Sequence, residues 1–241
     1  MKKLFKILIC LIVVDFFYFS TSFTFSHGYN TKMLEALLGL IVFIYDCVSK
    51  KDFKVTKTLI KLVFLAFGVS FASYLTMTVN NTPDSTYLSY VVSMIVWISA
   101  AFFVVRFLGY HYGNVTIELV ADYIVAVSFL QCTVSLLNDM VAPMHDFTLT
   151  VFNTGGMDQV QRMYGWGDTT TVDVGGTRHA LAAVLSAFMV TKAVGRKEKL
   201  IPWYLFAYMG ITVIGNMVAR TTSVGSLIGL AYILFYLFLN F

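Results

Sequence analysis

The chain has 241 residues, of which 58% are hydrophobic and only 12% are charged, and its formal net charge is +4. A soluble domain of this size could not cover so much apolar surface, so the composition excludes a soluble protein and predicts an integral membrane protein. The small positive charge does not indicate a nucleic-acid partner, because it is explained by the positions of the basic residues along the chain.

Eight apolar segments are each long enough to cross a bilayer core of about 30 Å as a helix. In chain order, the predicted spans are 4–25, 33–49, 58–79, 87–108, 117–138, 178–195, 200–218 and 222–241. The expected fold is therefore all-α, a polytopic bundle of transmembrane helices forming a single domain over 1–241. Its first span has no small-residue cleavage site, so it is predicted to be a retained span and not a signal peptide.

The basic residues predict the orientation of the bundle. With the N-terminus in the cytoplasm, thirteen of the seventeen Lys and Arg residues fall on the inner side. The four on the outer side are Lys32, Arg162, Arg178 and Arg220. This bias follows the positive-inside rule, and it places the polar segment 139–177 on the same outer side as Arg220.

Acidic residues and cysteines also occur within the apolar segments. The acids in or at the ends of spans, where ionised groups are costly, are Asp15, Glu35, Asp46 and Asp122. Asp46 and Asp122 are near the cytoplasmic ends and are expected to pair with Lys50 or Arg106, which leaves Asp15 and Glu35 as the better functional candidates. The cysteines are Cys10, Cys47 and Cys132. They have no ligand-like spacing, so we expect small core residues, no metal site and no cofactor.

Residues 139–177 are the only long polar segment and are predicted to form an outer loop. A loop of this length between apolar helices is usually either functional or disordered. Its glycine pairs and near-pairs, together with Tyr164 and Trp166, favour an ordered turn system that faces a ligand. A second polar interruption, 219–223, is expected to face this loop. In the last span, Gly225 and Gly229 have the spacing that allows close helix packing.

Three of the outer basic residues are arginines, at positions 162, 178 and 220. The planar guanidinium group can bind two phosphoryl oxygens at once and stays charged at a membrane boundary. Arg178 begins a predicted span and Arg220 ends one at the same depth. Both are therefore expected to point into one cavity that would suit a diphosphate on a lipid carrier. The alternative is that the arginines pair with head groups or with Asp158, Asp168 and Asp173, and so complete helix ends.

Two tracts carry a resemblance to a known family. The tract 175–183 opens a span after a Gly-rich outer loop. The tract 215–225 contains a polar break, Arg220-Thr221-Thr222-Ser223, between two spans that follow each other closely. They resemble the bacterial O-antigen polymerases and O-antigen ligases, and the resemblance covers roughly 155–241. It implies a membrane glycosyltransferase at the outer face of the bacterial inner membrane. Such an enzyme joins a glycan on undecaprenyl diphosphate to an acceptor glycan or lipid core, without a nucleotide sugar or an essential metal.

The resemblance also implies roles for individual residues. Arg178 and Arg220, together with Arg162, would hold the diphosphate and stabilise the charge that grows on the leaving oxygen. An acceptor hydroxyl would attack the anomeric carbon with inversion, while a general base takes its proton. The candidates for that base are His179, Asp173, Asp168 and His145.

The chain departs from this family in one respect. Members typically have more spans and a further outer loop after the hairpin that corresponds to Arg220. The resemblance therefore implies an N-terminal portion of such a protein, truncated at the C-terminus, whose site a partner chain would complete. The alternatives are a transporter or flippase-like subunit and a non-catalytic scaffold or remnant. A transporter is disfavoured because we find no internal repeat and the arginines lie away from the midplane.

Overall fold

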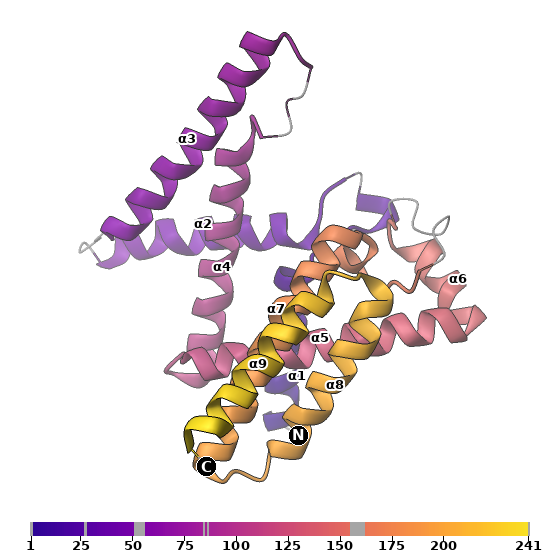
Figure 1. The fold of residues 1–241 in the computed structure, drawn as a ribbon. Helices are drawn as coiled ribbons and strands as arrows, with labels where there is room; N and C mark the ends of the chain where they lie inside the picture. The colour runs from indigo at the N-terminus through magenta and orange to yellow at the C-terminus, as the bar shows by residue number, and fades with distance from the viewer. Residues whose placement is uncertain are drawn as a thin grey trace. The chain divides into compact units, whose positions relative to one another are not determined.

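The computed structural model describes residues 2–26, 28–50, 56–83, 85, 87–154 and 162–240. Regular structure in these residues is helical, apart from two isolated β-bridges, Ser22 with Asn30 and Phe23 with Phe152. In chain order the elements are α1 (Lys2–Tyr18), η1 (Thr24–Ser26), α2 (Thr31–Lys50), α3 (Lys57–Asn80), α4 (Tyr90–Tyr112), α5 (Ile117–Met140), α6 (Ala142–Val151), η3 (Gly167–Thr170), α7 (Val172–Arg196), α8 (Ile201–Val218) and α9 (Thr222–Asn240) (Figure 1). The predicted all-helical class is confirmed.

Five of these helices, α3, α4, α5, α8 and α9, are long and apolar enough to cross a membrane. Large apolar side chains such as Phe64, Leu65 and Phe238 are exposed on them. Such surfaces suit lipid, because a bilayer is as apolar as the side chains that face it. The architecture is that of a helical membrane protein. The total of eight spans and the cytoplasmic N-terminus stay predictions.

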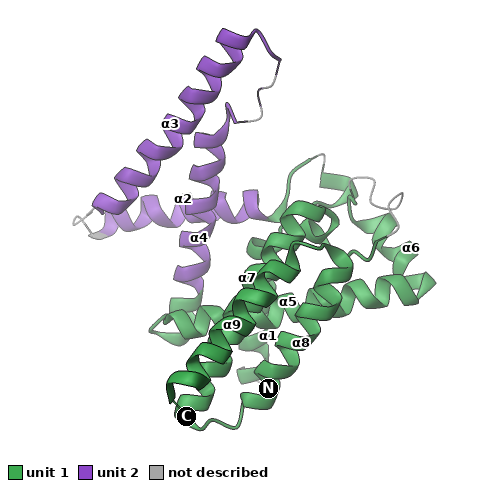
Figure 2. Cartoon of the chain, viewed as in Figure 1, with its two compact units in different colours: residues 1–31, 108–241 green, residues 32–107 purple. Residues whose placement is uncertain are grey.

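The chain divides into two compact units, one made of Met1–Thr31 with Leu108–Phe241 and the other of Lys32–Phe107 (Figure 2). The single domain expected over 1–241 stays a prediction. In the second unit, Arg106 Nη2 lies 2.6 Å from Asp46 Oδ2, which confirms the partner expected for Asp46.

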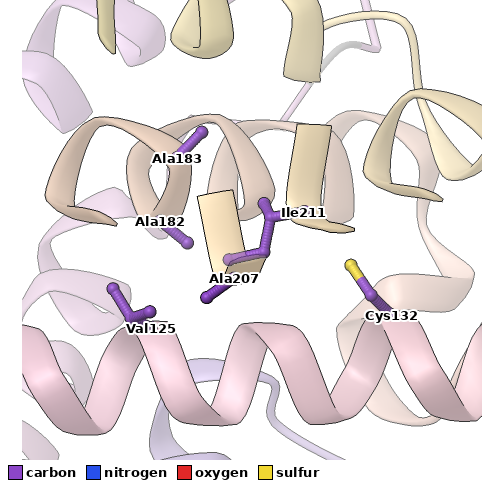
Figure 3. Packing of buried hydrophobic residues seen from close by; sticks show 6 residues of the cluster. All are labelled: Val125, Cys132, Ala182, Ala183, Ala207 and Ile211. Atoms are coloured by element: carbon purple, nitrogen blue, oxygen red, sulfur yellow. The ribbon is translucent and has the colours of Figure 1, made fainter. Parts of the chain in front are cut away.

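Helix α7 is the central element of the first unit, where it packs against α5, α8 and α9. Its contact surface is built from small residues, which allow helix backbones to approach closely. Figure 3 shows one buried cluster at the meeting of α5, α7 and α8, formed by Val125, Cys132, Ala182, Ala183, Ala207 and Ile211. Cys132 is therefore a small core residue, as predicted.

The glycines of α9 bring this helix onto α7. A Cβ atom added at Gly225 would overlap the backbone of Ala180, and one added at Gly229 would lie 3.1 Å from Ala187 Cβ. Tyr208 of α8 also holds α9, because its hydroxyl donates a hydrogen bond of 2.5 Å to the carbonyl oxygen of Ser226. The close packing predicted from the glycine spacing is confirmed.

The segment 139–177 is not a loop throughout. Ala142–Val151 forms α6, which carries a proline in its first turn, where the missing N–H costs nothing. Helix α7 begins at Val172, before the predicted 178, and has Asp173 in its first turn, where a negative charge is favourable. Residues 155–161, which include the predicted Asp158, lie outside the described part of the chain.

The packing of α9 on α7 predicts a strong effect of Gly225→Leu. The larger side chain would force the two backbones apart, and we expect a loss of about 1–3 kcal/mol or more in unfolding free energy. Thermal unfolding of the purified chain in detergent measures it. The matched control is Gly68→Leu in α3, where an added Cβ would meet nothing within 4 Å. Equal stability of the two variants would contradict the packing.

The length of α8 predicts that its two ends lie on opposite sides of the membrane, and the predicted cytoplasmic N-terminus places its Arg220 end outside. Its 18 residues span about 27 Å, close to the thickness of a hydrocarbon core. In a background in which Cys10, Cys47 and Cys132 are replaced by Ser, Arg220→Cys should react with a membrane-impermeant maleimide on intact cells. Lys199→Cys should react only after the cells are opened. The reverse pattern would place the N-terminus outside.

Candidate functional site

The polar residues of the first unit gather where the end of α1, η3 and the start of α7 meet. Gly167 opens η3 with a φ of +62°, and a Cβ there would meet Ser20 O and Thr21 Oγ1, each at 2.8 Å. Only glycine satisfies both the backbone conformation and the space. The described part of the Gly-rich segment is thus an ordered turn folded onto the end of α1.

Arg178 is the charged centre of this junction and is 7% exposed. Its Nη1 forms an ion pair with Asp168 Oδ2 and donates to the carbonyl oxygen of Tyr18. Tyr18 returns a hydrogen bond of 2.8 Å from its hydroxyl to the carbonyl oxygen of Arg178, and Ser20 Oγ donates to Asp168 Oδ2 at 2.6 Å. The rings of Tyr18 and Phe19 lie 5.9 Å from the guanidinium carbon. The sequence left open that an arginine pairs with an aspartate, and Arg178 does so.

His179 is fully buried beside this ion pair. Its ring lies 5.1 Å from that of Phe19, and Nδ1 is 3.7 Å from Cys132 Sγ. Nε2 has no hydrogen-bond partner among the described residues. A Cβ at Gly215 would come within 3.2 Å of His179 Cβ, so α8 packs directly against this histidine. In this position the imidazole is a core group, and its role as a general base stays a prediction.

The hairpin between α8 and α9 packs on the start of α7, as the sequence predicts for the segment 219–223. A Cβ at Gly176 would overlap Thr221 Oγ1 and lie 2.6 Å from Ala219 Cβ. Thr222 Oγ1 donates to Gly215 O at 2.9 Å and lies 3.5 Å from Gly176 O. Arg220 projects from this hairpin and is exposed.

Arg178 and Arg220 therefore come from adjacent segments but have different surroundings. Arg178 is buried against Asp168 and α1, whereas Arg220 is accessible. That both guanidinium groups point into one cavity stays a prediction.

The remaining candidates are more accessible. Asp173 is exposed in the first turn of α7, and its carbonyl oxygen accepts a hydrogen bond of 2.9 Å from Thr177 Oγ1. Arg162 is half-buried at the start of the described turn. His145 of α6 lies 3.1 Å through Nε2 from the hydroxyl of Tyr164. The described residues contain no group of three His, Cys, Asp or Glu side chains that could hold a metal ion.

Sequence reasoning missed one part of this junction. Gln131 of α5 donates a hydrogen bond of 2.9 Å to Asp15 Oδ1 and accepts one of 3.2 Å from the backbone N–H of Trp166. This amide connects the deepest acid of α1 to the Gly-rich turn. A polar residue inside an apolar span is itself a signal, because it must find a partner within the bundle. Tyr204 Oη also donates a hydrogen bond of 2.5 Å to Asp122 Oδ1, a partner that the sequence did not suggest.

Together these features define a helical membrane protein with an ordered polar junction at one end of α7. Comparison with protein-family models, curated proteins and solved structures finds no match for this chain.

The buried ion pair predicts a large stability effect for Arg178→Gln. Removal of the guanidinium group leaves Asp168 without its partner, and we expect a loss of about 3–5 kcal/mol in unfolding free energy. The control is Arg106→Gln, whose pair with Asp46 involves a side chain 45% exposed. That variant should lose about 0–1 kcal/mol. Thermal unfolding in detergent compares them, and similar losses would show that the Arg178 pair is not structurally important.

Proposed function

We propose that this chain acts at the outer face of the bacterial inner membrane on a glycan linked to undecaprenyl diphosphate, as a polymerase or ligase of such glycans. The observation that carries the proposal is the packing of the hairpin 219–223 on the Gly-rich start of α7. It joins the two tracts that resemble the O-antigen polymerases and ligases, and it lies at the end of α7 that carries Asp173 in its first turn. Arg220 and Asp173 are both exposed.

The burial of each arginine suggests which of them binds the diphosphate and which positions the site. Arg220 is the accessible cation, so it is the better candidate for binding the diphosphate. Arg178 holds η3 and α1 in place through Asp168 and Tyr18, so in this proposal it positions the site without touching substrate. Arg162 is half-buried and would extend the binding surface.

The proposed reaction is an inverting glycosyl transfer. An acceptor hydroxyl forms a bond to the anomeric carbon, and the bond from that carbon to the phosphate oxygen breaks. Undecaprenyl diphosphate leaves with the electron pair, and Arg220 stabilises the added negative charge. Asp173 is favoured over His179 as the base that takes the hydroxyl proton, because Asp173 is exposed and His179 is enclosed. A partner chain that completes the site is part of the proposal.

One observation favours a second candidate function. Arg178 and His179, the two most distinctive residues of the first tract, both make core contacts. That arrangement suits a non-catalytic scaffold within an assembly that handles lipid-linked glycans. The two candidates differ in whether the chain itself binds the diphosphate.

Binding of undecaprenyl diphosphate to the purified chain in nanodiscs tests the proposal. Arg220→Gln should weaken binding about tenfold, or about 1.4 kcal/mol, because it removes the accessible cation. Lys61→Gln, which removes an exposed cation of α3, should bind like the unaltered chain. Asp173→Asn should also bind normally. In native membranes, where the partner chain is present, it should lower glycan transfer about a hundredfold or more when a lipid-linked oligosaccharide is supplied as donor and acceptor.

The opposite result is equally clear. If Arg220→Gln and the unaltered chain bind undecaprenyl diphosphate with equal affinity, the polymerase or ligase mechanism is wrong for this chain. The scaffold would then be the better description.

A further inference from the structure

A second polar site lies at the other end of α7 and α9, away from the hairpin. It is a surface pocket of about 330 Å³. Its lining comes from the last turns of α7 and the second half of α9, and consists of Thr191, Lys192, Gly195, Arg196, Tyr232 and Tyr236. The proposed function does not use any of these residues.

The two cations of the pocket are only loosely paired. Lys192 Nζ and Arg196 Nη2 lie 3.8 Å and 3.4 Å from Glu118 Oε1, and Arg196 Nη1 lies 3.7 Å from Glu198 Oε1. Their side chains are 43% and 56% exposed. Ion pairs this long and this exposed contribute little, so both cations can turn to an anion of higher charge density. Lys197 and Lys199 follow and keep the local charge positive.

A glycine shapes the pocket beside these cations. A Cβ at Gly195 would lie 2.8 Å from Tyr236 Oη, so the missing side chain lets the phenol reach across the last turn of α7. A tyrosine hydroxyl next to Lys and Arg provides the donors that phosphate oxygens accept.

An apolar stripe on α9 adjoins the pocket. Ile228, Tyr232, Phe235 and Leu239 are exposed and recur at steps of four and three residues, which places them on one face of the helix. An alternative explanation of Lys192 and Arg196 is that they offset the partial negative charge at the C-terminus of α7. That role needs neither a pocket nor an apolar stripe next to it.

We propose that this pocket binds the phosphate of an anionic phospholipid whose acyl chains lie along the α9 stripe. The cations and the Tyr236 hydroxyl select a negative head group, and the stripe distinguishes a lipid from a free phosphate ion. A zwitterionic lipid fits less well, because its cationic group would face Lys192 and Arg196.

The test uses the whole chain, purified in a neutral detergent and stripped of lipid. Dioleoyl-phosphatidylglycerol, dioleoyl-phosphatidylcholine and sodium phosphate are added separately, and bound lipid and the melting temperature are measured by native mass spectrometry and thermal unfolding. We expect phosphatidylglycerol to be retained and to raise the melting temperature, and the other two to do neither. An equal rise with sodium phosphate, or equal retention of phosphatidylcholine, would overturn the proposal.

Variants then locate the site. Lys192→Gln with Arg196→Gln should weaken phosphatidylglycerol binding about tenfold or more. Gly195→Leu keeps every charge but fills the pocket, so it should have a similar effect. The control, Lys57→Gln with Lys61→Gln, removes the same charge from α3 and should retain the lipid.

The outcomes separate a pocket from general charge attraction. An equal loss of phosphatidylglycerol binding in the α3 control would show that any two cations attract the lipid, and it would overturn the proposal. Normal binding by Gly195→Leu would do the same. If the double variant is too unstable to purify, Tyr236→Phe removes a single donor and should still weaken binding, and an unchanged affinity there would count against the site.

Discussion

The close approach of backbones around α7 is the constraint on which the first unit depends. In a bilayer, helices gain no hydrophobic free energy from leaving lipid, so their association relies on tight packing of small residues. Gly225 meets the backbone of Ala180, and Gly176 leaves room for Ala219 and Thr221. These contacts hold α9 and the α8–α9 hairpin in place, and the positions of Arg220 and Asp173 follow from them.

The ion pair of Arg178 with Asp168 adds a polar constraint to this apolar one. A buried guanidinium group is costly unless its donors are satisfied, and here a carboxylate and the carbonyl oxygen of Tyr18 accept from it. These partners come from η3 and α1, so the pair connects three elements distant in sequence. The same burial makes Arg178 and His179 better suited to shaping the junction than to contacting substrate.

Helix α7 has different chemistry at its two ends. Near its start Arg178 is buried and paired with Asp168, while near its end Lys192 and Arg196 are exposed and loosely paired. The first arrangement gives a rigid junction with one accessible cation beside it on the hairpin. The second leaves cations free to exchange partners, which suits a mobile ligand such as a lipid. The proposed polymerase or ligase function uses the first end, and the proposed binding of an anionic lipid uses the second.

Sequence alone was sufficient for the class and for several local features. The apolar composition and segment lengths predicted a helical membrane protein, and the spacing of Gly225 and Gly229 predicted close packing, because both depend on residue type and periodicity. The contact between the segment 219–223 and the start of α7 was also expected. The helix α6 within the polar segment was not, since its ten residues lack a long apolar run.

Burial was decided only by the tertiary structure. Arg178 and Arg220 look equivalent in sequence, yet one is enclosed by α1 and η3 and the other is exposed. Phe19, Cys132 and Gly215 surround His179, which the sequence offers as a candidate base. Gln131 was not singled out at all. Residue type determines which chemistry a side chain can perform, but distant segments determine whether a substrate can reach it, and no local pattern encodes their arrangement.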